Sequence, residues 1–305
     1  MDVKHYEDCE QLFLSVGKCF LVEALLEFFS MANCSQTPKK HIPPDGVLST
    51  RQQRERFCEQ TLDNFINTYL VSNEIAEDDK VQNYSLNLVR SYLILADYKD
   101  AVATGNGQHL AVIHKLILKH FFAVPGFNAY AIEMLLSVMQ NEILLSPAEV
   151  HQSIWASTAN WRGGANHNIE IDLLQENSNR DIKTLIKLMG PNKTDGAINR
   201  ASKAAGGVRT IVETFDAEVS LHTQSSSHAH KSASEDERKI LKELRKLRPF
   251  HHTAGREHAS FPNVTSNPIH ALNEVDFQAW LEKHKRNIEI HFPLNDHEDD
   301  EAPEV

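Results

Sequence analysis

Two carboxylates between Asn168 and Gly190 could hold a divalent cation, and three further polar side chains recur with them at helical spacing. At about 3.6 residues per turn they share one stripe of a helix, in the order Asp172, Glu176, Asn179, Arg180 and Lys183. Carboxylate oxygens bind Mg²⁺ and Mn²⁺, and a complete set of such ligands supports phosphoryl transfer. The middle of this segment, Gln175–Asp181, contains no apolar residue at all.

Three structures fit this polar stripe. Asp172 and Glu176 repel each other at i,i+4 unless a cation lies between them, whereas Glu176 and Arg180 attract by about 0.2–0.5 kcal/mol. A solvated helix face is the favoured interpretation, followed by a buried ionic clamp between helices and then by a catalytic metal site. We predict no metal-binding residue and no cofactor.

A glycine-containing loop, Asn160–Asn168, precedes the stripe. Gly163 and Gly164 permit backbone conformations that other residues avoid, so a tight turn delivers the chain into the helix. A glycine-rich loop that opens a helix can also bind an anion. No strand precedes this loop and no Lys-Ser/Thr pair follows it, so we favour a plain connecting turn.

Histidines are numerous in the second half of the chain, but they lack metal-ligand partners at set spacing. We predict solvated loop histidines at His222, His228, His230, His251, His252 and His258. His114 and His120 lie in an apolar segment and are expected at the core or its boundary. The sequence contains no Ser-His-Asp arrangement in a recognisable context and no dinucleotide fingerprint.

A basic amphipathic segment, Arg238–Arg248, is expected to dock on the helical body with its charged face in solvent. Weak contact with nucleic acid, or binding of an acidic partner helix, are the alternatives. The formal charge of the whole chain is −11, which disfavours tight non-specific binding of nucleic acid. The acidic tail that begins at Asp296 is expected to be solvated.

The composition indicates a globular intracellular protein, cytoplasmic or nuclear, without a membrane segment. Hydrophobic residues make up 41% of the 305 residues and charged residues 24%. The four cysteines form no C-x-x-C pair, so they are expected as reduced thiols. The acidic N-terminus does not resemble a signal peptide, and Lys18, Glu23 and Glu27 interrupt the one long apolar run.

Helical patterns dominate the chain and predict an all-α fold, an irregular multi-helix bundle with a loosely ordered C-terminal tail. The helical domain is expected over residues 1–249, followed by linker, short helix and acidic tail over residues 250–305. Helix ends are predicted at Gly105 and at Gly206-Gly207. Capping boxes are predicted at Ser146 and Ser234, and Thr194 can cap a further helix. The residues Ile288–Phe292 are either a lone edge strand or not a strand.

The chain resembles a multi-copy eukaryotic family known only as a domain of unknown function. The similarity covers about Val16–Phe250 and is fairly specific as a whole. It is carried by four segments, "NYSLNLVRSYLILADYKDAVATGNG", "NAYAIEMLLSVMQNEILLSP", "IDLLQENSNRDIK" and "MGPNKTDGAINRASKAAGG". In the third segment Asp172, Leu173, Glu176, Asn179 and Arg180 match the family pattern Asp-Leu-x-x-Glu-x-x-Asn-Arg, while Leu174 and Asn177 replace two histidines of that pattern.

The resemblance implies a relation to transposases with a ribonuclease-H-like catalytic core. In such enzymes two carboxylates from a sheet and a glutamate from a later helix hold two metal ions. On that analogy this chain corresponds to a helical insertion plus the helix that bears Glu176. Glu176 and Asp172 are then vestiges of a catalytic site, and Asn179, Arg180 and Lys183 are binding or structural residues.

The leading hypothesis is a non-catalytic helical protein, a partial or domesticated copy of a transposon-like gene, which acts through protein or nucleic-acid contacts. The first alternative is a Mg²⁺- or Mn²⁺-dependent nuclease or transposase that uses Glu176 and is completed by another chain. The second is a purely structural scaffold in which the polar stripe is an ionic clamp.

Overall fold

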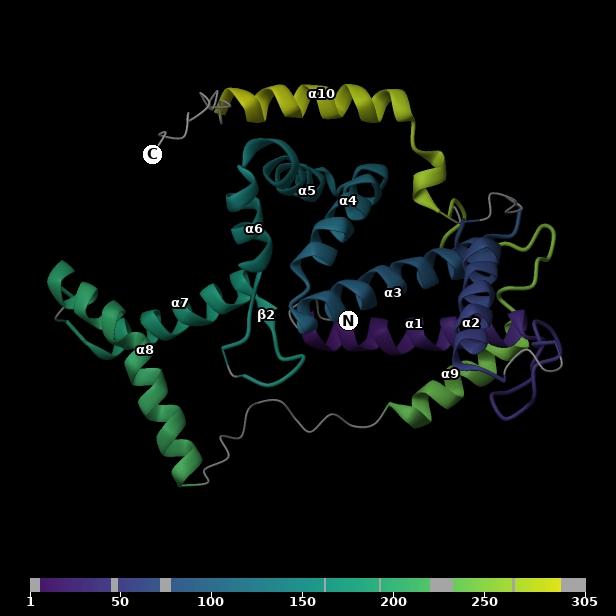
Figure 1. The fold of residues 1–305 in the computed structure, drawn as a ribbon, viewed down its shortest axis with the longest axis horizontal. Coiled ribbons are helices and arrows are strands. Elements are labelled where there is room, and N and C mark those ends of the chain that lie inside the picture. The colour runs from purple at the N-terminus through teal and green to yellow at the C-terminus, as the bar shows by residue number, and fades with distance from the viewer. Residues whose placement is uncertain are drawn as a thin grey trace, which may run out of the picture. The chain divides into compact units, whose positions relative to one another are not determined.

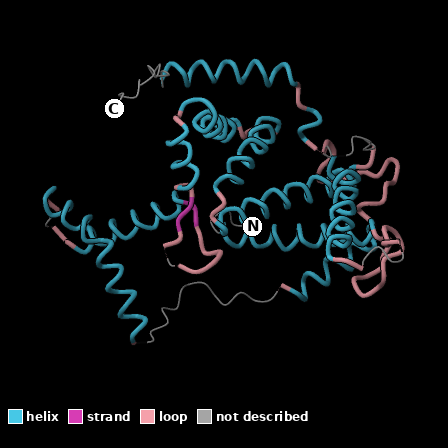
Figure 2. Tube along the Cα trace, in the orientation of Figure 1, coloured by secondary structure: helices cyan, strands magenta, loops and turns pink. Residues whose placement is uncertain are grey.

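A computed structural model describes residues 6–44, 49–71, 78–161, 163–191, 193–219, 233–264 and 267–291. These residues form ten α-helices and a single pair of two-residue strands, so the predicted all-α class is confirmed (Figures 1 and 2). None of these helices has the length and apolar character that crossing a membrane requires. The predicted acidic tail and His222, His228 and His230 lie outside the described residues.

The chain divides into two compact units. The first comprises Met1–Tyr98, Ile113–Met139 and Ser232–Val305, and the second comprises Lys99–Val112 and Gln140–Lys231. The domain boundary that the sequence predicts at residue 249 therefore falls within the first unit.

The first unit is built from seven helices, two of which, α3 and α4, also supply residues to the second unit. They are α1 (Tyr6–Phe28), α2 (Arg51–Ile66), α3 (Lys80–Thr104), α4 (Gly107–Ala123), α5 (Asn128–Met139), α9 (Ser234–Leu247) and α10 (Glu274–His291). A π-helical turn, Asn67–Val71, extends α2, and a 3₁₀ turn, Pro268–Ala271, precedes α10.

Aromatic side chains form the centre of the first unit. Phe28 of α1 meets Phe65 at 5.5 Å and Tyr69 at 6.2 Å between ring centroids, both nearly edge to face. Tyr69 in turn meets Phe250 at 5.7 Å. Edge-to-face pairs add stabilisation beyond the area that they bury, so this cluster joins three segments that are distant in sequence.

The residues that follow α9, predicted as linker, are mostly exposed and lack regular secondary structure, but a buried ion pair anchors them. Arg256 donates Nε and Nη2 hydrogen bonds of 2.9 and 2.7 Å to the two oxygens of the fully buried Asp79. Asp79 also accepts backbone N–H groups of Gln82 and Thr253 at 2.9 and 2.8 Å. Burial raises the pKa of Asp79, but these hydrogen bonds outweigh it and hold the pKa below its ordinary value.

The basic helix α9 docks on α1, as the sequence predicts. Its Leu244 is buried in the aromatic core, and Lys18 of α1 pairs with Glu237 at 2.9 Å. Arg245 Nη1 lies 3.2 Å from Oε1 of the buried Glu23, yet neither Glu23 oxygen accepts a hydrogen bond from a described residue. The pair is close but poorly aligned, so the cost of burying Glu23 is only partly offset.

Three predicted helix boundaries, one C-terminal and two N-terminal, are confirmed. α3 ends at Thr104, directly before Gly105. Ser146 caps α6 in the expected capping box with Glu149. Thr194 accepts the backbone N–H of Ala197 at 3.3 Å and so caps α8.

One predicted helix cap is wrong. α9 begins at Ser234, so this residue lies in the first turn rather than at the cap, and Ala233 makes no side-chain hydrogen bond. Of the two alternatives for Ile288–Phe292, the second holds for Ile288–His291, which belong to α10 and form no strand, because the helical pattern of the preceding turns continues through them. α5 buries only Ala131, Leu135 and Met139, although its sequence is mostly apolar.

The second unit contains a π-helical turn (Gln140–Leu144), three helices and the strand pair. The helices are α6 (Pro147–Trp155), α7 (Ile171–Leu188) and α8 (Asp195–Glu218), and the strands are β1 (Thr158–Ala159) and β2 (Ile169–Glu170). α8 continues through Gly206 and Gly207, where the sequence predicts its end. Neither glycine has a positive φ, and the turn that would end the helix does not form.

Candidate functional site

The polar stripe of α7 is exposed to solvent. Asp172, Glu176, Asn179, Arg180 and Lys183 all have exposed side chains. Glu176 and Arg180 form no ion pair, and within the described part of the chain Asp172 and Glu176 have no cationic partner. The clamp interpretation is therefore wrong for these two carboxylates, and a solvated face describes them.

Charge along this stripe changes sign from one end of α7 to the other. The carboxylates Asp172 and Glu176 occupy its first half, and Arg180, Lys183 and Lys187 occupy its second half. Negative groups near the start of a helix and positive groups near its end both interact favourably with the helix dipole. This arrangement stabilises α7 without requiring a ligand.

An ionic clamp does exist, on the opposite side of α7. Asp181 lies nine residues after Asp172, or about 180° around the helix, and its Oδ2 accepts a 2.7 Å hydrogen bond from Nε of Arg209 in α8. A second Arg209 nitrogen also contacts Oδ2. The Arg209 guanidinium lies 5.3 Å from the centre of the Trp161 ring, which adds a cation–π contact.

The loop that carries Trp161 is positioned by a short hairpin. Thr158 pairs with Glu170 and Ala159 with Ile169 in the two strands. Gly163 and Gly164 have φ of 73° and 89°, so the predicted tight turn is confirmed.

Side-chain hydrogen bonds complete this loop. The Asn160 amide donates to the Gly164 carbonyl at 2.7 Å, which closes the turn. The Asn168 amide donates to the Ala103 carbonyl at 2.9 Å, which fastens the loop to the end of α3.

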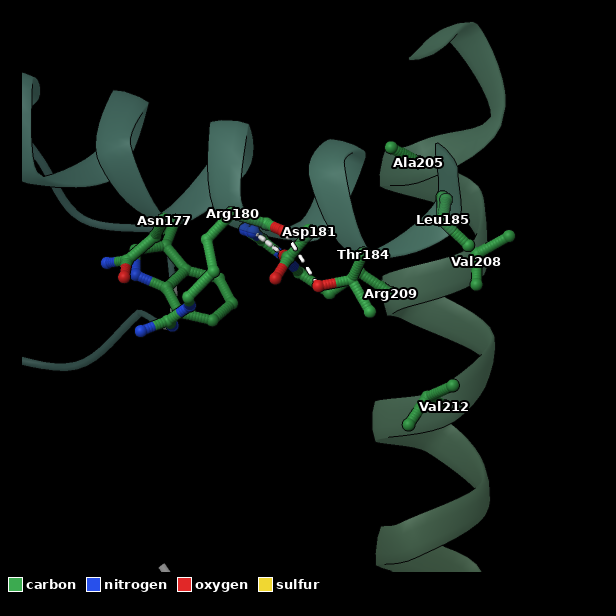
Figure 3. Close-up of a pocket in the computed structure, with 10 residues that line it drawn as sticks. Asn177, Arg180, Asp181, Thr184, Leu185, Ala205, Val208, Arg209 and Val212 are labelled. Atoms are coloured by element: carbon green, nitrogen blue, oxygen red, sulfur yellow. Dashed lines mark hydrogen bonds and ion pairs between the residues drawn. The ribbon is translucent and has the colours of Figure 1, made fainter. Parts of the chain in front are cut away.

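A pocket of about 580 Å³ lies where α7 crosses α8 (Figure 3). Trp161 and the Asp181–Arg209 pair line it, together with the exposed Arg180. Two guanidinium groups against one carboxylate give the polar part of the pocket a net positive charge. The apolar part is formed by α8, where Val208 and Val212 are seen along the helix in Figure 3.

The apolar lining of this pocket continues along α8 as a row of exposed side chains, which we call the α8 row. Its members recur every three or four residues and so lie on one side of the helix. They are Val208, Ile211, Val212, Phe215 and Val219, with exposed fractions of 38%, 70%, 51%, 56% and 50%. Apolar side chains grouped in this way on a soluble protein typically mark a surface that binds something.

The sequence interpretation missed Asp181, Arg209 and the five residues of the α8 row, which build this site. Asp181 lies in the polar stretch but on the opposite side of the helix from the stripe, so the periodicity that defines the stripe leaves it out. Gly206-Gly207 predicts a helix end, so the sequence does not indicate that Arg209 and the α8 row continue the same helix. The apolar spacing after residue 207 was the signal that could have revealed both.

The predicted loop histidines show mixed surroundings. His251 and His252 are exposed, within 3.9 Å of a carboxylate oxygen of Glu27 and of Asp79, respectively. His258 is half-buried, and its ring centroid lies 5.0 Å from that of Tyr84, so its predicted solvation is wrong. Among the described residues no three His, Cys, Asp or Glu side chains gather as a metal site would require.

Comparison with known proteins identifies one family. The family model described as "Family of unknown function (DUF6589)" matches residues 2–228 of this chain. No curated protein and no solved structure matches the chain. The matched range covers α1 to α8 and therefore includes both the polar stripe and the α8 row.

Proposed function

The chain belongs to this family of unknown function, and we propose that it is a non-catalytic helical protein that acts through protein contacts, pairing its α8 with the α8 of a second copy. The observation that supports the proposal is the α8 row, five apolar side chains that the described part of the chain leaves exposed. Covering such a face with a second amphipathic helix removes apolar surface from water.

Charge complementarity favours a second copy as the partner. When two α8 helices pair antiparallel with Val208 opposite Val219, Glu218 of one copy lies at the same level along the helices as Arg209 and the positive pocket of the other. The pocket at Arg209 also contains Arg180 and is net positive, whereas Glu218 is exposed at the end of α8. A two-fold axis repeats this contact, so each copy supplies one acidic end and one basic pocket.

Sedimentation velocity of the full chain tests this pairing. We expect a monomer–dimer equilibrium between about 1 and 100 µM, where association free energies of about 5–8 kcal/mol become visible. Phe215→Glu places a charge in the centre of the α8 row and should weaken dimerisation at least about tenfold. Thr214→Glu is the matched control, because it adds the same charge one residue away on an exposed side of α8.

A charge exchange makes the test independent of the apolar row. Arg180→Glu and Glu218→Arg should each weaken the dimer, and the double variant should recover most of the lost affinity. A chain that stays monomeric throughout this range overturns the proposed pairing. So does a dimer that Phe215→Glu and Thr214→Glu affect equally.

The proposed lack of catalysis rests on a different observation. Asp172 and Glu176 are exposed on one stripe, but no third carboxylate or histidine joins them within the described residues. Two carboxylates from one helix do not make a two-metal site. The replacement of two family-pattern histidines by Leu174 and Asn177 supports the same proposal, and with it the origin as a partial or domesticated copy of a transposon-like gene.

A DNA cleavage assay in Mg²⁺ or Mn²⁺ separates this proposal from the nuclease alternative. We expect no cleavage above background for the wild-type chain or for Glu176→Ala. Metal-dependent cleavage by the wild type that Glu176→Ala abolishes would establish the alternative.

A further inference from the structure

A second pocket, of about 370 Å³, lies in the first unit between α3, α4 and α5. Most of its lining is apolar, with Ile94 and Leu95 from α3, Ile117 and Phe121 from α4 and Met134 from α5. Its volume falls within the range typical of small-molecule sites. No lining residue is an Asp, Glu, Lys or Arg, so the pocket offers no charge to balance an ionised ligand.

The polar groups of this pocket are the hydroxyls of Ser91 and Tyr98 on α3 and the imidazoles of His114 and His120 on α4. Nδ1 of His114 lies 3.0 Å from the Ser137 hydroxyl, so one nitrogen of that ring already has a hydrogen-bond partner. His120 is half-buried, and its ring makes no hydrogen bond to another described residue. Burial lowers the pKa of both imidazoles, which are therefore neutral near pH 7.

We propose that this pocket binds a small, neutral, mainly apolar molecule with one hydroxyl group, which hydrogen-bonds to the His120 ring. A neutral imidazole offers one donor and one acceptor nitrogen, and a hydroxyl group matches either of them. The apolar walls accommodate the remainder of the molecule. The hydroxyl of the ligand thus gives the His120 ring the hydrogen-bond partner that it lacks among the described residues.

Titration of the full chain with three probes of similar size tests the proposed ligand class. The probes are 2-naphthol, naphthalene and 2-naphthoate, with binding followed by isothermal titration calorimetry. We expect 2-naphthol to bind about threefold to tenfold more tightly than naphthalene, the difference that one neutral hydrogen bond typically makes. The naphthoate anion should bind most weakly, because the lining holds no cation.

His120→Phe removes the polar atoms while keeping a ring of similar shape. It should reduce the affinity for 2-naphthol to that for naphthalene and leave the naphthalene affinity nearly unchanged. His151→Phe, at an exposed position on α6, is the matched control and should change neither. As a second measurement that needs no variant, 2-naphthol should shift the His120 ring resonances in an NMR spectrum and leave those of His151 in place.

Three results would overturn the inference. The first is that neither neutral probe binds, and the second is that naphthalene and 2-naphthol bind the wild type equally. The third is that naphthoate binds most tightly, which would point instead to a cationic site. None of these results bears on the α8 pairing, which concerns the other unit.

Discussion

The helix pairs α1–α9 and α7–α8 each contain an amphipathic helix, α9 in the first pair and α8 in the second. The apolar face of α9 is buried within the chain, whereas that of α8 is exposed. α9 buries Leu244 and packs Ile240 and Leu241 against the aromatic core. α8 keeps the whole α8 row at least 38% exposed. Both helices have apolar residues at three- and four-residue spacing, so their periodicity alone does not distinguish them.

The charges on the neighbouring helix account for part of the difference. α1 presents Lys18, Glu23 and Glu27 to α9, where Glu237, Arg245 and Arg248 lie at ion-pair distance. Among the side chains that the structure describes, α7 forms one ion pair with α8, between Asp181 and Arg209. One pair fixes a crossing point, whereas the hydrogen-bonded pairs Lys18–Glu237 and Glu27–Arg248 hold α9 near both of its ends. A row of exposed apolar residues therefore indicates that a helix face binds another segment. The charged residues beside the row indicate which segment can bind there.

The largest expected contrast comes from truncating one apolar side chain in each pair. Leu244→Ala should lower the free energy of unfolding by about 2–5 kcal/mol, because it leaves a cavity in the core. Phe215→Ala, in dilute protein, should change it by less than about 0.5 kcal/mol, because Phe215 is 56% exposed. Urea denaturation followed by circular dichroism measures both, and equal losses would contradict the comparison.

The next contrast is a pH dependence confined to α1–α9. Burial raises the pKa of Glu23 from 4.5 to about 7, opposed by Arg245 and reinforced by Glu27. Between these two values the folded chain holds a proton that the unfolded chain has released. Stability should therefore fall as pH rises from about 4.5 to about 7, by roughly 3 kcal/mol at most.

Glu23→Gln isolates this contribution, because the amide stays neutral and similar in size. The variant should lose this slope and become more stable than the wild type above pH 7. Unfolding free energies at several pH values provide the measurement, with Glu176→Gln as the exposed control. A wild-type chain whose stability rises over this interval would show that Glu23 is not the dominant group.

A smaller effect is expected at the single ion pair of α7–α8. Asp181→Ala should lower stability by about 1–2 kcal/mol, since it leaves the partly buried Arg209 without its carboxylate. Glu176→Ala, on the exposed side of the same helix, should have an effect of less than about 0.5 kcal/mol. The melting temperatures of both variants show which face of α7 stabilises the second unit. A larger loss for Glu176→Ala than for Asp181→Ala would indicate an ionic clamp on the polar stripe.

The smallest effect concerns the glycine pair in the middle of α8. A Cβ added at Gly206 or Gly207 would meet nothing within 4 Å. Alanine should therefore stabilise the helix by about 0.5–1 kcal/mol at each position. Amide hydrogen exchange in the second half of α8 should slow accordingly. Unchanged or faster exchange would indicate that the glycines serve a conformation other than the straight helix.

The sequence predicted the parts of this fold that local chemistry decides. The Ser146 capping box and the stop at Gly105 depend on a few neighbouring residues, and both formed as expected. At Gly206-Gly207 the local preference was overridden, because the apolar and polar alternation resumes beyond the pair. The candidate site depends on which residue of α8 reaches Asp181, and helical periodicity within α7 carries no information about that partner.

The ordered charges of α7 bear on how the second unit assembles. Carboxylates in its first half and cations in its second half favour helix formation in an isolated 18-residue segment, before any neighbour is present. During synthesis, α7 emerges from the ribosome ahead of Arg209. We therefore expect α7 to form helical turns early and to offer Asp181 at a defined position when Arg209 of α8 arrives.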